Sequence, residues 1–277
     1  MQVQGIYRSV VNITTVDGLL TVASPQAGGL PNGIMADLGQ DWRTIGLRPG
    51  MAVCAGQAEV WVPDAGLEIR LDGSARWSPR FPKPDLVDDG RTARWRRRAV
   101  ATRAVARDRA SAGGLGTLLR RDTARDDRAG AVAIARPIVA ELIVALGAGD
   151  RPTATGLAGG LIGLGPGLTP SGDDLLVGIE AALHALDRPT AGFMARALDG
   201  VEDRTTALAA TRLRHAAAGE FAERLHMLLG ALLGSDEAII VAAVERATAW
   251  GATSGTDCLL GVLIGLDAAA GVGEVLA

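Results

Sequence analysis

Residues that could bind or orient an anion are concentrated in residues 163–176, Gly-Leu-Gly-Pro-Gly-Leu-Thr-Pro-Ser-Gly-Asp-Asp-Leu-Leu. The glycine and proline residues of the first half predict a loop, and the second half predicts the first turn of an apolar helix. The backbone amides of such a loop and of a helix N-terminus can act together on a phosphate or carboxylate group. The stretch therefore predicts an anion site. The alternative is a well-capped, buried helix whose glycines permit close packing.

Two capping arrangements are compatible with this helix start. Thr169 could be the N-cap with Pro170 at the first helical position, or Ser171 could be the N-cap with Asp174 closing a capping box. Either arrangement places Asp173 and Asp174 near the positive end of the helix dipole.

The common nucleotide motifs do not fit residues 163–176. A Walker A loop ends in Gly-Lys-Ser/Thr, and the single lysine of the chain is Lys83. A dinucleotide fingerprint requires a third glycine where Pro170 stands.

A second helix start has the same pattern. Residues 254–259, Ser-Gly-Thr-Asp-Cys-Leu, match residues 171–176 as Ser-Gly-x-Asp-x-Leu, with glycine and threonine before the serine in both. One such start is ordinary capping. Two of them predict that paired helix N-termini face a single anion, which requires Ser171 and Ser254 to lie within about 15 Å of each other.

The composition favours a globular protein of one large or two ordinary domains. The chain has 277 residues, of which 48% are hydrophobic, and a mean hydropathy of +0.22. The two longest apolar stretches, 129–146 and 259–276, are interrupted by charged residues, and the N-terminus lacks the pattern of a signal peptide. We therefore expect a soluble cytoplasmic protein that does not bind membranes, with helices buried in a large core or against a partner.

Charge and cysteine content exclude further classes of function. A net charge of -3 argues neither for a nucleic-acid partner nor for an acidic membrane surface, and we expect no nucleic-acid partner. Cys54 and Cys258 are far apart in sequence, so we expect neither a disulfide framework nor a cysteine-based metal site.

The N-terminal region predicts short strands. Residues 6–14, 19–23, 51–53, 59–62 and 67–71 have strand-like composition, and the Asp17-Gly18 pair predicts a hairpin. Prolines 79, 82 and 84 then indicate a domain boundary. The predicted fold class is α+β, with a small antiparallel β barrel or sandwich at residues 1–85 and an all-helical domain at residues 86–277.

An arginine-rich segment opens the helical part. Residues 91–128 contain twelve arginines and four aspartates, an excess of eight positive charges. The segment is either a solvated helix face or a surface that attracts an acidic partner or an anionic substrate.

The remaining sequence predicts helices throughout. Their expected ranges are 131–146, 153–162, 171–186, 204–218, 220–233 and 236–250, the last with Ser235 as its N-cap. Asp173, Glu180 and His184 share one face of the third, which we expect to be its solvent-exposed side.

The chain resembles the AllH family. The resemblance rests on residues 161–174, on Thr205-Thr206, and on Gly251 with Ser254, Gly255 and Asp257, and it extends to the turn at residues 31–33. Ala252-Thr253 departs from the His-Ser pair common in the family. The family is a subunit of oxamate carbamoyltransferase in allantoin breakdown, a complex that converts oxalurate and phosphate to oxamate and carbamoyl phosphate for a carbamate kinase.

The resemblance implies a set of site residues. Moving a carbamoyl group to phosphate needs no covalent nucleophile but requires two anions held together and an oxyanion stabilised. The candidates for catalysis are Asp173, Asp174 and Asp257, which we expect to orient other groups, and Mg²⁺ is the one metal compatible with them. The candidates for binding the small anionic substrate are Gly165, Gly167, Thr169, Ser171, Gly172, Thr205, Thr206, Ser254 and Gly255.

A second hypothesis is that the chain is a non-catalytic subunit or anion-binding protein whose partner holds the active site. The partners expected from the resemblance are the other carbamoyltransferase subunits and a carbamate kinase. A free-standing hydrolase is disfavoured because no residue supplies its nucleophile.

Overall fold

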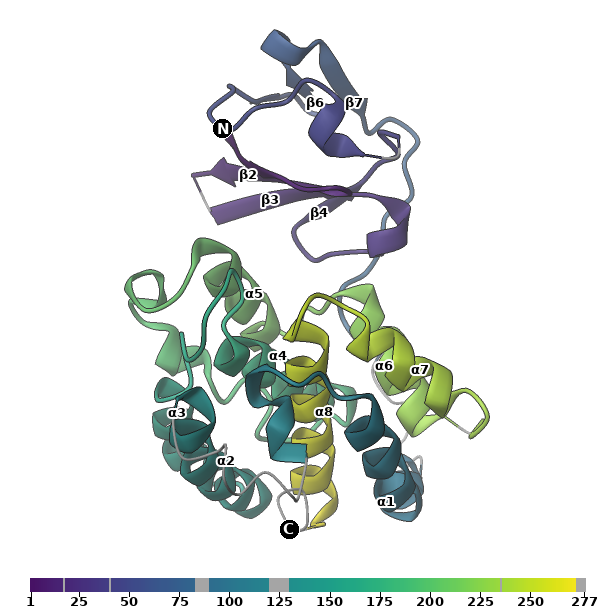
Figure 1. Cartoon of the computed structure of the whole chain (residues 1–277), viewed down its shortest axis with the longest axis vertical. Coiled ribbons are helices and arrows are strands. Elements are labelled where there is room, and N and C mark those ends of the chain that lie inside the picture. Colours follow the sequence, from purple (N-terminus) through teal and green to yellow (C-terminus); the bar gives the residue numbers. More distant parts are fainter. Residues whose placement is uncertain (17, 40, 83–89, 120–129, 235, 273–277) are drawn as a thin grey trace. The chain divides into compact units, whose positions relative to one another are not determined.

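The computed structural model describes residues 1–16, 18–39, 41–82, 90–119, 130–234 and 236–272. The chain divides into two compact units, one formed by Met1–Pro79 with Ala222–Arg224 and one formed by Arg80–Phe221 with Leu225–Ala277 (Figure 1). The first contains the strands and the second is helical, so the predicted α+β class is confirmed. The domain boundary predicted between residues 85 and 86 lies outside the described residues.

The β unit is a small sandwich-like arrangement of two sheets and is not a closed barrel. One sheet has the order β1-β2-β3-β4 and the other the order β5-β6-β7. Valine, isoleucine and tryptophan side chains such as Val11, Ile13 and Trp42 fill the core. The strands are β1 (Gln2–Ile6), β2 (Val10–Thr15), β3 (Gly18–Ala23), β4 (Gly33–Met35), β5 (Cys54–Ala55), β6 (Glu59–Val62) and β7 (Leu67–Arg70).

The predicted strand at residues 6–14 is two strands. The Tyr7 amide donates to the Val10 carbonyl at 2.8 Å and closes a turn between β1 and β2. The expected strand at residues 51–53 is reduced to a bridge between Ala52 and Gln2, with β5 following it. β2 and β3 form the expected antiparallel pair, although Asp17 of the predicted turn lies outside the described residues.

β4 pairs with β3 in parallel, which corrects the prediction of an entirely antiparallel unit. The connection between them returns the chain to the start of β3, where Asn32 holds it. The Asn32 carbonyl accepts the Thr21 amide at 2.9 Å, and its side-chain amide donates to the Leu19 carbonyl at 2.9 Å.

The described part of residues 130–277 consists of helices and turns and contains no strand, as predicted. The predicted helix at 204–218 begins later, at Ala207, because the Thr206 hydroxyl caps it by accepting the Ala209 amide at 3.1 Å. Ser235, the predicted N-cap of the helix at residues 236–250, lies outside the described residues. The helices are α1 (Arg91–Arg109), α2 (Ala131–Ala148), α3 (Arg151–Gly159), α4 (Ser171–Ala185), α5 (Ala207–Ala217), α6 (Glu223–Leu233), α7 (Ile240–Thr248) and α8 (Ser254–Ala270).

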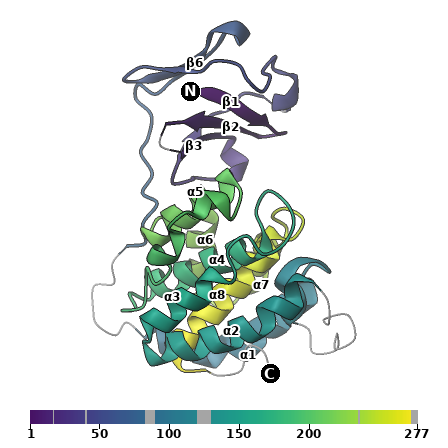
Figure 2. The same cartoon turned by 90° about the vertical axis from the view of Figure 1, so that its left-hand side faces the viewer.

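Helices α4 and α8 lie side by side in the middle of the helical unit (Figures 1 and 2). Glycines let their backbones touch: a Cβ atom at Gly178 would lie 2.1 Å from the Cys258 carbonyl oxygen, and one at Gly261 would lie 2.0 Å from that of Leu175. Each glycine stands seven residues after the serine that opens its helix, and each meets the carbonyl four residues after the other serine. The two helices therefore pack reciprocally, in an approximately two-fold manner.

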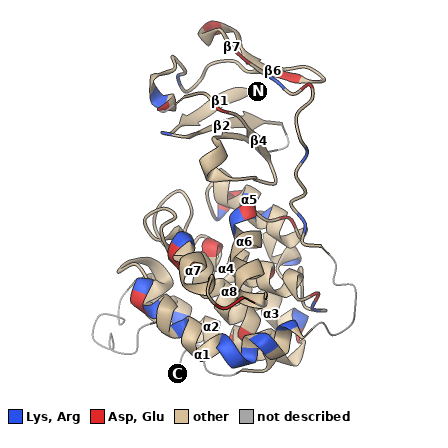
Figure 3. Ribbon diagram, turned by 90° about the vertical axis from the view of Figure 1, so that its right-hand side faces the viewer, with Lys and Arg blue, Asp and Glu red and all other residues tan. Residues whose placement is uncertain are grey.

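Figure 3 marks the arginines of α1 along the helix, and several of them bind other parts of the helical unit, so the helix is more than a solvated face. Arg103 is buried and forms an ion pair with Asp267 at 2.5 Å. Other arginines donate to backbone carbonyls, Arg94 to Leu233 and Arg96 to Ala270. The arginines at 120, 121, 125 and 128 lie outside the described residues.

Helix α2 is the one helix among the described residues that is long and apolar enough to cross a membrane. One such helix is weak support for a membrane span, because a core helix of a water-soluble protein passes the same test. Here Val139 and Leu142 are buried in the helical core, while Arg136 and Glu141 interrupt the apolar sequence.

Candidate functional site

The two Ser-Gly-x-Asp helix starts are in contact, as their repetition predicts. The hydroxyl oxygens of Thr169 and Ser254 lie 2.7 Å apart. Burial raises the pKa of Asp174 and of Asp257, and nearby hydroxyls oppose this rise, those of Ser254 and Thr169 at Asp174 and that of Ser171 at Asp257. The serine of each start therefore meets the aspartate of the other.

Neither predicted capping arrangement is correct. α4 has Pro170 as its N-cap and α8 has Thr253, and the side chain of neither accepts a hydrogen bond from an amide of its helix. Ser171 and Ser254 are the first helical residues, so their hydroxyls are directed to the neighbouring helix start instead of to their own backbone.

Asp173 fixes the loop that precedes α4. Its carboxylate accepts the Gly163 amide at 2.9 Å and the Thr205 hydroxyl. The neighbouring Thr206 hydroxyl donates to the Leu168 carbonyl at 2.6 Å. Both threonines expected from the resemblance therefore hold residues 163–170.

Asp174 binds an arginine that the sequence analysis did not identify. Its Oδ1 lies 2.6 Å from Nη1 of Arg212, and the carboxylate is 1% exposed. The guanidinium carbon of Arg212 lies 4.8 Å from the centre of the Trp250 ring. Arg212 lies inside α5 and Trp250 after the end of α7, and no local pattern distinguishes either residue.

Asp257 fixes residues 114–119, a segment between α1 and α2. Its Oδ1 accepts the amides of Leu115 and Gly116 at 2.7 and 3.1 Å. Gly114, with φ +66°, lies so close that a Cβ atom there would be 2.5 Å from Oδ2. The glycine-rich run at residues 113–116 is the signal that could have pointed to this contact.

Burial raises the pKa values of all three carboxyl groups. The pKa of Asp257 is raised to about 6, and those of Asp173 and Asp174 are raised by the same cause. Each is at most 2% exposed and binds protein donors, so these carboxylates face the interior. Their contacts fit the expected role of orienting other groups.

The amides at the helix starts are already bonded, contrary to the premise that they are free for an anion. The Gly172 amide donates to the Leu164 carbonyl and the Gly255 amide to the Trp250 carbonyl, both at 2.9 Å. The amides of Asp173 and Asp174 donate to Pro170, and that of Asp257 donates to Thr253. The helix-start amides that were expected to bind the anion are therefore largely used by the protein itself.

The loop before α4 keeps unbonded donors. Within the described parts of the chain, the amides of Gly165, Gly167, Leu168 and Thr169 have no acceptor. Gly165 and Gly167 have φ values of +111° and +102°, and Gly167 and Leu168 are exposed. Such consecutive free amides are the usual elements of an anion-binding loop.

Gly172 and Gly255 have a packing role. A Cβ atom at either would lie 2.0 Å from a carbonyl oxygen, of Leu161 for Gly172 and of Ala247 for Gly255. At these two positions the glycines therefore permit close packing, which was the alternative to an anion-binding role. A valine at Gly172 or Gly255 would therefore disturb the helical core.

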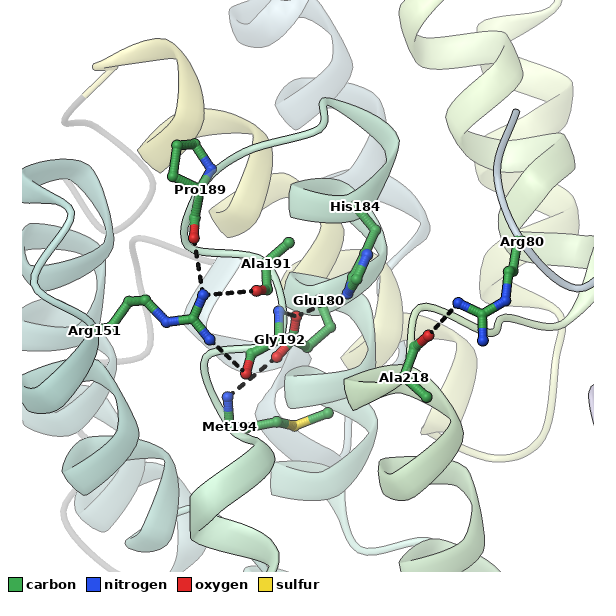
Figure 4. Close-up of polar contacts among 9 residues, drawn as sticks. All are labelled: Arg80, Arg151, Glu180, His184, Pro189, Ala191, Gly192, Met194 and Ala218. Atoms are coloured by element: carbon green, nitrogen blue, oxygen red, sulfur yellow. Dashed lines mark hydrogen bonds and ion pairs between the residues drawn. The ribbon is translucent and has the colours of Figure 1, made fainter. Parts of the chain in front are cut away.

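The expectation of a solvent-exposed stripe on α4 is wrong. Glu180 is fully buried, and its carboxylate accepts hydrogen bonds from the amides of Gly192 and Met194 at 2.7 and 3.2 Å. Arg151 donates to backbone carbonyls of the same loop, residues 189–194 (Figure 4). His184 Nε2 lies 3.6 Å from the Glu180 carboxylate. This second polar cluster holds residues 189–194.

Among the residues that the structure describes, no three His, Cys, Asp or Glu side chains are grouped in a way that could hold a metal ion. The three aspartates, as the described residues place them, therefore do not form a ready set of ligands for the Mg²⁺ ion considered above.

Two family models match the chain. The AllH family N-terminal domain matches residues 2–76, and the oxamate carbamoyltransferase subunit AllH matches residues 161–266. The second range contains both helix starts and the residues between them. No solved structure matches the chain.

Proposed function

The chain belongs to the AllH family of oxamate carbamoyltransferase subunits, and from this premise we propose that it takes part in the phosphorolysis of oxalurate. In this reaction a phosphate oxygen bonds to the carbamoyl carbon, and the bond from that carbon to the oxamate nitrogen breaks. The nitrogen takes the proton of the hydrogen phosphate ion, so that oxamate and carbamoyl phosphate are the products. We place the reaction in the cytoplasm, in allantoin catabolism, with a carbamate kinase consuming the carbamoyl phosphate.

The observation that carries the proposal is the loop of free amides beside the two joined helix starts. Phosphorolysis requires two anions to be held together and negative charge to be stabilised on the carbamoyl oxygen. The amides of Gly165, Gly167, Leu168 and Thr169 provide such donors. The loop that carries them is held in place by Thr206 and Asp173.

The three aspartates do not oppose an anion at this loop. An exposed carboxylate would repel phosphate, but these three are buried and each is bonded to an amide, a hydroxyl or a guanidinium group. Their part in the proposal is to hold the donors in position. In this proposal none of the three aspartates transfers a proton.

The second candidate function is a non-catalytic subunit whose partner holds the active site. It is favoured by the helix-start amides, which are satisfied within the chain, so that the repeated sequence of the two starts already has a structural purpose.

Reconstitution with a loop variant separates the two functions. Gly167 has φ +102°, and no atom lies within 4 Å of the place where a Cβ atom would stand. Gly167→Val therefore strains the backbone of the loop without a steric clash with the core. Gly39→Val in the β unit is the matched control, since Gly39 has φ +94° and equally open surroundings. Each variant is assembled with the other subunits, and carbamoyl phosphate formation from oxalurate and phosphate is measured.

The proposal expects Gly167→Val to lower the rate at least about tenfold, because misplaced oxyanion donors typically cost that much or more, while Gly39→Val retains it. Unchanged activity of an assembled complex that contains Gly167→Val would favour the non-catalytic role.

A further inference from the structure

Arg212 is the one guanidinium group that the described structure brings to the joined helix starts. It pairs with Asp174, and the same carboxylate is stabilised by the hydroxyls of Thr169 and Ser254. Arg212 therefore belongs to the same cluster as the last residues of the loop that carries free amides.

The guanidinium group is held rigidly. Its Nη1 atom lies 2.6 Å from the carboxylate of Asp174, which is 1% exposed. Its central carbon lies 4.8 Å from the centre of the Trp250 ring, which supports the guanidinium group from one side. The side chain is 19% exposed, so it reaches solvent over a limited area. An arginine fixed by an ion pair and an aromatic face loses little further freedom when it binds a ligand.

Most donors of this guanidinium remain available. Within the described residues, Nη1 makes the one hydrogen bond of Arg212 to the protein, and Nε and Nη2 are not bonded to it. A planar fork with two parallel N–H groups matches the two oxygens of a carboxylate. Because Asp174 neutralises its charge, Arg212 contributes directed hydrogen bonds more than a general attraction for anions.

We infer that Arg212, supported by Trp250, binds the planar carboxylate of the ureido acid, while phosphate binds elsewhere. The inference rests on the proposed function and assigns the two anions to different donors. The carboxylate binds the free edge of Arg212, and the phosphate binds the amides of the loop. Arg212 is thus a substrate-binding residue that takes no part in bond breaking.

The test compares the affinities of the two ligands by calorimetry, in the lone chain and in the assembled complex. Oxamate is the probe for the carboxylate and inorganic phosphate is the probe for the loop. Arg212→Lys keeps the positive charge and removes the fork. Arg214→Lys is the matched control, because Arg214 lies on the same helix and pairs with Glu202 at the surface.

The expected result is that Arg212→Lys weakens oxamate binding at least about tenfold, since a charge-assisted bidentate pair is lost, and changes phosphate binding less than about threefold. Arg214→Lys should change neither. Equal weakening of both ligands, or unchanged oxamate binding, would overturn the inference.

A second set of variants and the binding of the wild-type protein separate the outcomes of the test. If Arg212→Lys fails to fold by circular dichroism, Trp250→Leu replaces it and should weaken oxamate binding, with Trp250→Phe restoring it. A wild-type protein that binds phosphate but not oxamate overturns this inference alone. A wild-type complex that binds neither ligand overturns the proposed function as well.

Discussion

Three buried aspartates of one cluster bind donors from different segments of the chain. Asp173 accepts a loop amide and a threonine hydroxyl, Asp174 pairs with Arg212, and Asp257 accepts two amides of the segment at residues 114–119. A buried carboxylate is stable only when such partners satisfy it. The residue type and its spacing were visible in the sequence, but the partners come from segments 10 to 142 positions away and were not.

The pair formed by Thr169 and Ser254 should contribute to stability through the bond between their hydroxyls and not as helix caps. We predict that Thr169→Val and Ser254→Ala are coupled in a double-mutant cycle by about 1 kcal/mol in the free energy of unfolding, because each single change removes the same hydrogen bond. Denaturant unfolding of the two single variants and the double variant measures this coupling. Strictly additive effects would mean that the two helix starts are stabilised independently.

Glu180 should make the stability of the helical unit depend on pH. Burial raises its pKa to about 8 from an ordinary value of 4.5, against the lowering effect of the Gly192 and Met194 amides. The folded state then holds a proton that the unfolded state has lost, so the stabilisation is complete below pH 4.5 and is lost as the pH rises through about 8.

The measurement is the free energy of unfolding between pH 5 and about 8.5, where each pH unit is worth at most about 1.4 kcal/mol for one proton. Glu180→Gln should flatten this decline, and Glu141→Gln, at an exposed position of α2, should leave it unchanged. A Glu180→Gln variant with the wild-type slope would assign the pH dependence to other groups.

At the scale of elements, α4 and α8 depend on glycine at their crossing. A Cβ atom at Gly178 or Gly261 would lie 2.1 or 2.0 Å from a carbonyl oxygen of the other helix, well inside the 3.0 Å below which real Cβ contacts essentially never occur. Because α4 and α8 form the centre of the helical unit, separating them moves the two helix starts apart. The position of the candidate site is thus set by close packing several residues away from it.

We predict that Gly178→Ala and Gly261→Ala each lower the free energy of unfolding by at least about 2 kcal/mol, as expected for overpacking against backbone. Gly156→Ala in α3 is the control, since nothing lies within 4 Å of its Cβ position and alanine favours a helix by up to about 1 kcal/mol. Denaturant unfolding measures all three. Similar effects of all three changes would show that the crossing tolerates a methyl group.

The sequence predicted which elements exist better than it predicted their contacts. The glycine-rich loop, both helix starts and most helix ranges followed from local patterns. The capping roles of Ser171 and Thr169 did not, because a hydroxyl satisfied by another helix start has the same local sequence as a cap. The parallel pairing of β4 and the buried face of α4 were also missed, since both depend on contacts distant in sequence.

At the scale of the whole molecule, the β unit and the helical unit have separate hydrophobic cores. The first is centred on residues such as Trp42 and Val60, and the second on residues such as Leu176 and Leu263. Each unit can therefore lose its own packing without direct loss of the other core.

We predict that calorimetry resolves two unfolding transitions. Trp42→Ala removes a fully buried side chain of the β unit and should lower the temperature of one transition, while Leu263→Ala in α8 should lower the other. A single transition that shifts equally with both changes would contradict the independence of the two cores.

The central claim is that the amides of the loop before α4 bind the anion. The most direct measurement is the amide chemical shift of Gly165 and Gly167 in a titration of the ¹⁵N-labelled chain with inorganic phosphate, with Gly39 and Gly73 as reference glycines. We expect saturable shifts of the Gly165, Gly167, Leu168 and Thr169 amides, because these amides have no acceptor in the described protein. Phosphate binding that leaves these four amides unchanged would contradict it.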